Sequence, residues 1–164
     1  MGHPGFSYIG LLWLLMLAVP NFLWARHQPQ GYIARNENRL LVILERTGQV
    51  CVTGAALLFA DTNPTAFTSW TCWLLASLLL MLLYLAWWIR YFRGSRRLAD
   101  FYSSFCGLPL AGATLPVLAF LLLGIYGRLI WLVLGTLLLG VGHIGIHLRH
   151  AREIGAGPFS GSRQ

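Results

Sequence analysis

Five long apolar runs constrain this chain more than any other feature of its 164 residues. Each run contains about 20 residues, the length that an α-helix needs to cross the hydrocarbon core of a bilayer. The runs cover Phe6–Trp24, Leu40–Ala60, Trp70–Tyr91, Phe105–Tyr126 and Leu129–Leu148. The sequence therefore predicts an all-α integral membrane protein, with a single domain of five transmembrane helices over residues 1–150.

The composition also favours a membrane protein. Apolar residues make up 57% of the chain and charged residues only 10%, whereas about a quarter of the residues of a soluble domain are charged. This small number of charges cannot cover a surface that faces water. A bilayer must therefore solvate much of the chain. Residues 151–164 are rich in glycine and serine, which predicts a flexible cytoplasmic tail.

The arginines predict the orientation of the helices. The formal net charge of +7 comes from arginine alone, because the chain contains no lysine. The amino-terminal flank and the second loop carry no arginine, and the fourth loop carries only Arg128, whereas the first loop, the third loop and the tail are basic. The positive-inside rule then places the amino terminus outside and the carboxyl terminus in the cytoplasm, for a multi-pass protein of a bacterial-type inner membrane. It explains the basic charge without a nucleic-acid partner.

The fourth run leaves an alternative topology open. It contains Gly107, Pro109, Gly112 and Pro116, and each proline leaves a helical carbonyl without its usual donor. The run is thus a kinked spanning helix or a re-entrant segment in a chain with four spans. If it spans, the kink lies beside a pocket or results from packing alone.

A polar stripe follows the last run. Three of the five histidines lie at its end. Steps of three and four residues, which place side chains on one helical face, connect Thr136, Gly140, His143, His147 and His150. Ionisable residues inside a membrane are costly and mark functional sites, so we expect the site on this face.

Matching depths predict a partner for this stripe. If the second helix enters the membrane near Leu40 and the fifth leaves it near Arg149, then Glu45 and His143 both lie about 7–9 Å inside the same face. A carboxylate in hydrocarbon needs a partner or a proton. We therefore expect Glu45 to lie near His143 or near Arg46. The predicted ligand-binding residues are Glu45, Arg46, Gln49, His143 and His147.

The same residues raise the question of a metal. His143 and His147 present two imidazoles on one face, as zinc and iron sites do, and Glu45 or Glu37 would add a carboxylate. The alternative is that the histidines form hydrogen bonds within the bundle or lie exposed among the headgroups. Haem is not expected, because the remaining histidines, at positions 3 and 27, lie in flanking segments.

Three functions are consistent with this pattern. The leading one is the binding or transport of a small molecule or ion at a polar site open to the cytoplasm. The second is a membrane enzyme that acts on a lipid, with or without a metal, where arginines such as Arg90 hold the phosphate. The third is a non-catalytic subunit or scaffold. A face formed by Gly135, Gly142 and Gly145 would let another helix approach closely, for example in a homodimer.

Overall fold

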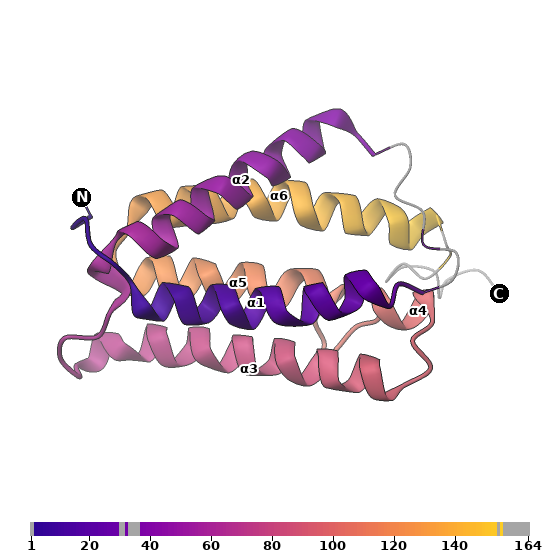
Figure 1. The fold of residues 1–164 in the computed structure, drawn as a ribbon, viewed down its shortest axis with the longest axis horizontal. Helices are drawn as coiled ribbons and strands as arrows, with labels where there is room; N and C mark the ends of the chain where they lie inside the picture. Colours follow the sequence, from indigo (N-terminus) through magenta and orange to yellow (C-terminus); the bar gives the residue numbers. More distant parts are fainter. Residues whose placement is uncertain (1, 30–31, 33–36, 154, 156–164) are drawn as a thin grey trace.

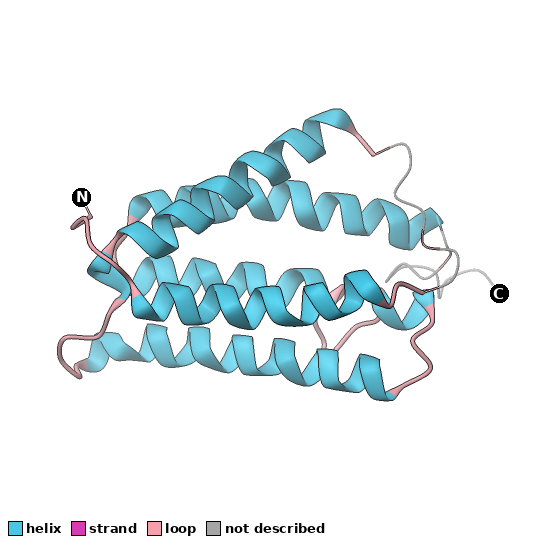
Figure 2. Ribbon diagram, viewed as in Figure 1, coloured by secondary structure: helices cyan, strands magenta, loops and turns pink. Residues whose placement is uncertain are grey.

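Long helices form over the apolar runs of the sequence. The computed structural model describes residues 2–29, 32, 37–153 and 155. These residues form helices and turns without a strand (Figure 2), which confirms the all-α prediction. The long helices run in alternating directions along the bundle (Figure 1): α1 (Tyr8–Arg26), α2 (Arg39–Leu58), α3 (Cys72–Arg93), α5 (Ala111–Tyr126) and α6 (Ile130–Glu153).

Four helical segments of the described chain are long and apolar enough to cross a membrane, which is typical of an integral membrane protein. They are Tyr8–Arg26, Arg39–Leu58, Ser69–Arg93 and Ile130–Glu153. The remaining long helix, α5, has 16 residues and is about 24 Å long, somewhat less than the hydrocarbon thickness of about 30 Å.

The short length of α5 differs from the predicted run over residues 105–126. Helix α5 begins six residues later because the segment before it turns. Cys106, Gly107 and Leu110 have φ angles of 51°, 78° and 49°, and Phe105 pairs with Leu108 in an isolated bridge. Glycine adopts such angles easily and Pro109 has no N–H to donate, so this segment favours a turn over a helix.

The last helix also differs from its predicted extent. Helix α6 continues to Glu153, five residues beyond the end of the predicted run, so residues 151–153 of the expected tail are helical. Residues 154 and 156–164 of that tail lie outside the described residues.

The two ends of the bundle are built differently. At one end, here called the N-terminal end, two short 3₁₀ helices, η1 (Ala60–Thr62) and η2 (Ser69–Thr71), connect α2 to α3. The other end, here called the α4 end, contains the short helix α4 (Leu98–Phe101) between α3 and α5. Helices α1, α3 and α6 finish at the α4 end, and α2 and α5 begin there (Figure 1).

Helices α2 and α6 approach each other backbone to backbone. A Cβ atom added to Gly48 on α2 would overlap the backbone of Leu139, and one added to Gly142 on α6 would overlap the backbone of Glu45. Only glycine allows this approach, because any side chain would separate the two helices. The contact brings α2 close to α6 one residue before His143 of the polar stripe.

Candidate functional site

The centre of the candidate site is a contact between Glu45 on α2 and His143 on α6. The Oε1 atom of Glu45 lies 2.6 Å from Nδ1 of His143. Both side chains are partly buried, with 16% of the glutamate and 27% of the histidine exposed. Both residues belong to candidate membrane spans. The neighbourhood predicted from their equal depths is therefore present in the structure.

The backbone geometry explains why this pair forms. Gly142 packs against the backbone of Leu41 and Glu45, one position before His143. The α2 backbone is therefore within reach of a short imidazole side chain on α6. An ionised Glu45 carboxylate can only accept a hydrogen bond, so Nδ1–H of His143 is the donor in that state.

His147 continues the site toward the α4 end. Its ring centroid lies 4.5 Å from that of His143. It also lies 5.7 Å from the ring of Phe101 and 5.8 Å from the ring of Tyr102. Tyr102 is almost fully buried, with 3% of its surface exposed. The second histidine of the stripe is thus enclosed by the α4 segment as well as by α6.

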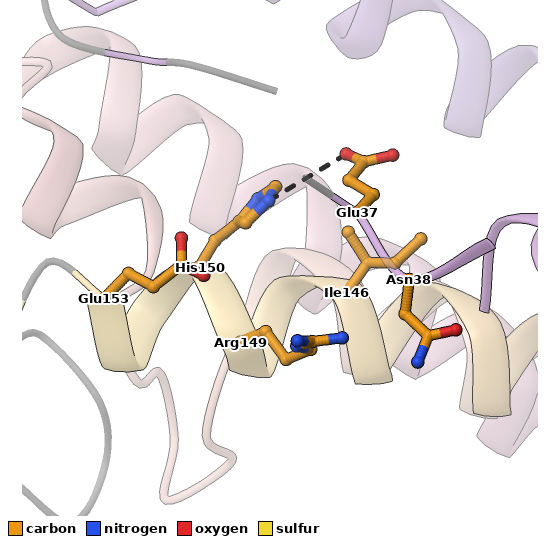
Figure 3. Close-up of a pocket in the computed structure, with 6 residues that line it drawn as sticks. All are labelled: Glu37, Asn38, Ile146, Arg149, His150 and Glu153. Atoms are coloured by element: carbon orange, nitrogen blue, oxygen red, sulfur yellow. Dashed lines mark ion pairs between the residues drawn. The ribbon is translucent and has the colours of Figure 1, made fainter. Parts of the chain in front are cut away.

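His150 occupies the outermost part of the stripe, in a small pocket (Figure 3). The pocket is lined by Glu37, Asn38, Ile146, Arg149, His150 and Glu153. The imidazole points toward Glu37, with Nε2 3.9 Å from the carboxylate Oε1, and its ring lies 6.5 Å from that of Tyr32. The pocket volume is about 10 Å³, which is room for about one water molecule.

Two tyrosine hydroxyls lie in the field of the acidic residues at the α4 end. Burial, followed by the charges of Glu37 and Glu45, raises the pKa of Tyr32. Burial also raises the pKa of Tyr102 well above its ordinary value, with a further contribution from the negative groups around it. Both phenols therefore keep their protons at neutral pH and can donate hydrogen bonds as well as accept them.

Two of the predicted ligand residues do not join this site. Arg46 and Gln49 are exposed on the outer side of α2, whereas Glu45 and Gly48 face α6. Arg46 is therefore not the partner of the Glu45 carboxylate in this structure. The structure thus brings Glu45 together with His143 and leaves Arg46 and Gln49 on the exposed side of α2. Ligand binding at these residues stays a prediction.

The structure gives no support to the predicted metal site of Glu45, His143 and His147. No group of three or more His, Cys, Asp or Glu side chains in the described part of the chain is arranged to hold a metal ion. Glu45 and His143 instead bind each other. Metal binding at these residues stays a prediction.

The glycine face of α6 is occupied by α2 of the same chain. Gly135 packs on Cys51, Gly142 on the backbone of Glu45 and Gly145 on the side chain of Leu41. The close approach of helices is therefore used inside the subunit. A homodimer stays a prediction, and it requires a surface other than this one.

Arg90, a predicted phosphate-binding residue of the lipid-enzyme hypothesis, instead contacts the chain that leads to α5. Its guanidinium donates hydrogen bonds to Oγ of Ser103, at 2.6 Å, and to the carbonyl of Ser104, at 3.3 Å. The same group lies 5.0 Å from the centre of the Phe105 ring. These contacts give Arg90 a structural role at the α4 end.

Phe101 packs at the centre of the aromatic side chains of the α4 end, which no pattern in the sequence indicates. Its ring stacks on that of Trp24 at 4.8 Å and contacts further aromatic rings from α3, α6 and the neighbouring loops. These rings belong to Tyr32, Trp87, Trp88, Tyr91, Tyr102 and His147. Phe101 thus links the α4 segment to the histidine stripe.

Comparison with known proteins adds no further evidence on the site. No protein-family model, curated protein or solved structure matches this chain significantly. The interpretation of the site therefore depends on its own geometry.

Proposed function

We propose that this protein binds an ion or small polar solute at Glu45 and His143 and exchanges it with the cytoplasm, as part of transport or sensing. The hydrogen bond of 2.6 Å between the two side chains carries the proposal. Two ionisable groups inside candidate spans are expensive to maintain and are retained where they have a function. Histidine is also the side chain that changes charge near neutral pH. The small pocket at His150 favours an ion over a larger solute.

The proposal includes a topology of five spans, with the amino terminus outside and the carboxyl terminus in the cytoplasm. Eight arginines lie at or near the α4 end, where the positive-inside rule places the cytoplasm: Arg26, Arg39, Arg90, Arg93, Arg96, Arg97, Arg149 and Arg152. Arg128 lies near the opposite end. The short α5 is compatible with a span because its neighbours cover it, with Leu115, Ala119 and Leu123 fully buried.

Variants of the central pair test the proposed function. Purified protein in proteoliposomes on a solid-supported membrane would be exposed to concentration jumps of Na⁺, K⁺, Cl⁻ and H⁺. We expect the wild type to give a transient current with one of these ions. Glu45→Gln and His143→Ala should abolish that current, because each removes one member of the hydrogen-bonded pair, while far-UV circular dichroism and membrane insertion stay unchanged.

His27→Ala provides the matched control. His27 is an exposed histidine at the same end of the bundle, and its ring contacts the carbonyl of Leu23 rather than a carboxylate. This variant should keep the wild-type current. Equal currents in the wild type and in both site variants would contradict the proposal, as would a wild type that responds to none of the four ions.

A further inference from the structure

A row of groups that can bind protons leads from the central pair to the surface of the α4 end. It begins at the Glu45–His143 hydrogen bond, continues through the adjacent ring of His147 and ends at His150, which faces Glu37 across the small pocket. The rings of His143 and His147 lie 4.5 Å apart. His150 follows three positions later on α6, and residues at this spacing lie on the same face of a helix.

The surroundings of His147 are suited to proton exchange. The titratable groups around its ring come from three elements: His143 and His150 on α6, Tyr102 beside α4, and Glu45 on α2, which it reaches through His143. Tyr102 keeps a hydroxyl that can donate and accept. The ring is otherwise enclosed by Phe101, so neighbouring protonatable groups surround a partly buried imidazole.

The available space restricts what can travel along this row. The pocket at its outer end holds about one water molecule, and the inner end is a direct side-chain hydrogen bond. The described residues also assemble no group of three metal ligands. A proton needs neither a cavity nor a coordination shell, because it moves from one nitrogen or oxygen atom to the next.

We infer that the ion is a proton, and that it travels between the pocket at Glu37 and the Glu45–His143 pair through His150 and His147. This inference rests on the proposed function of the pair and names its ion and its route. In each step one N–H bond breaks as the next forms. At the inner end, His143 accepts a proton on Nε2 and passes its Nδ1 proton to the Glu45 carboxylate. The net result is a neutral Glu45 and a neutral His143 in its other tautomer.

The route predicts a difference between the rate and the extent of proton uptake. Protein in lipid nanodiscs would be followed by time-resolved infrared spectroscopy after a drop in pH, using the carboxylic acid band that Glu45→Gln removes. His147→Ala should slow the appearance of this band by roughly 10²-fold, the contribution of a positioned proton-transfer group. Its final amplitude should stay unchanged, because Glu45 and His143 remain in place.

Chemical rescue with imidazole distinguishes a proton-relay role of His147 from a packing role. Imidazole added to His147→Ala should restore the fast phase by occupying the space of the missing ring, and should not accelerate the wild type. His147→Asn provides a second variant that keeps a polar side chain if the alanine variant does not fold, and it should be slow as well. His27→Ala, which lies outside the row, should show the wild-type rate.

The outcomes separate the two proposals. A wild type without any carboxylic acid band that depends on Glu45 would overturn the proton inference. The proposed site would still stand if Glu45→Gln and His143→Ala abolish a current of Na⁺, K⁺ or Cl⁻, and it would fall with the proton inference if they abolish none. A band that appears at the wild-type rate in both His147 variants would overturn the route alone. A slow rate in His147→Ala that imidazole does not restore would also overturn the route and leave His147 with a structural role.

Discussion

At the scale of single residues, the Asp61 carboxylate is one of the groups that hold the N-terminal end together. Asp61 accepts a hydrogen bond from the backbone N–H of His3 at 2.6 Å, and its other oxygen lies 2.7 Å from Nδ1 of the same residue. Backbone hydrogen bonds on either side, from Gly5 to Leu58 and from Ala60 to His3, fix the segment before α1 against the end of α2. Asp61 thus connects the start of the chain to the α2–α3 connection.

This contact makes the stability of the folded protein depend on pH under acidic conditions. Burial raises the pKa of Asp61, but the hydrogen bonds and the charge of His3 outweigh it, so the pKa lies below its ordinary value of 3.8. A lowered pKa in the folded state means that the contribution to stability is complete above the ordinary value and is lost as the pH falls through the lowered one. Asp61→Asn should therefore melt below the wild type at neutral pH.

Thermal melting in nanodiscs at a series of pH values would measure this difference. The gap between wild type and Asp61→Asn should close as the pH falls below the ordinary value of 3.8, because the wild type then loses the same charge. A gap that stays constant down to the most acidic pH would contradict the role of the ionised carboxylate.

The residues of α2 show how far a single sequence predicts a site. The depth of Glu45 follows from counting residues along a helix, so its contact with His143 was predictable. The face of α2 that meets α6 does not follow from polarity, because Arg46 and Gln49 are polar and yet exposed. Gly48 is the residue that indicates the contact face, because it lies where α2 and α6 approach each other most closely. Gln49, the next residue, lies beside this face.

At the scale of helices, the Glu45–His143 contact should depend on the close approach of α2 and α6 at their glycines. Gly48→Ala places a Cβ atom against the backbone of Leu139, and backbone atoms cannot move aside as a flexible side chain does. Overpacking of this kind costs about 1–3 kcal/mol. The variant should melt at a lower temperature and lose the Glu45–His143 contact, because α2 must move away from α6.

Gly54→Ala gives a control on the same helix. A Cβ atom at Gly54 meets nothing within 4 Å, and alanine favours a helix over glycine by about 0.5–1 kcal/mol. This variant should be as stable as the wild type or more so, and should keep the infrared signature of Glu45. Equal melting temperatures for the two alanine variants would refute the proposed close approach.

The elements that the sequence failed to predict depend on contacts between distant segments. Trp87, Trp88 and Tyr91 have the sequence pattern of an interfacial aromatic belt, but they are buried. Phe101, from a helix of four residues, packs on all three rings. Neither periodicity nor composition indicates which side chain of a short loop helix will enter the bundle, so this cluster was not predictable.

At the scale of the whole molecule, the alternating direction of the helices makes the topology testable with the native cysteines. Cys72 lies at the N-terminal end at the start of α3, Cys106 lies between α4 and α5, and both are exposed. Variants that keep one cysteine would be treated in intact cells with a maleimide that does not cross membranes. We expect Cys72 to react at once and Cys106 to react only after permeabilisation, because the basic α4 end faces the cytoplasm.

A cysteine at position 155 decides between five spans and four. In a background without the native cysteines, Gly155→Cys places the label just beyond the end of α6. If α5 crosses the membrane, this cysteine lies on the same side as Cys106 and needs permeabilisation. If α5 is re-entrant, α6 starts from the cytoplasm and Gly155→Cys reacts from outside.

A reaction of Gly155→Cys from outside would place the end of α6 and the α4 segment on opposite sides of the membrane. In the bundle, however, the end of α6 lies against Phe101 and Tyr102 of the α4 segment. The histidine stripe would then lose its α4 neighbours, so the labelling experiment tests the architecture on which the site depends.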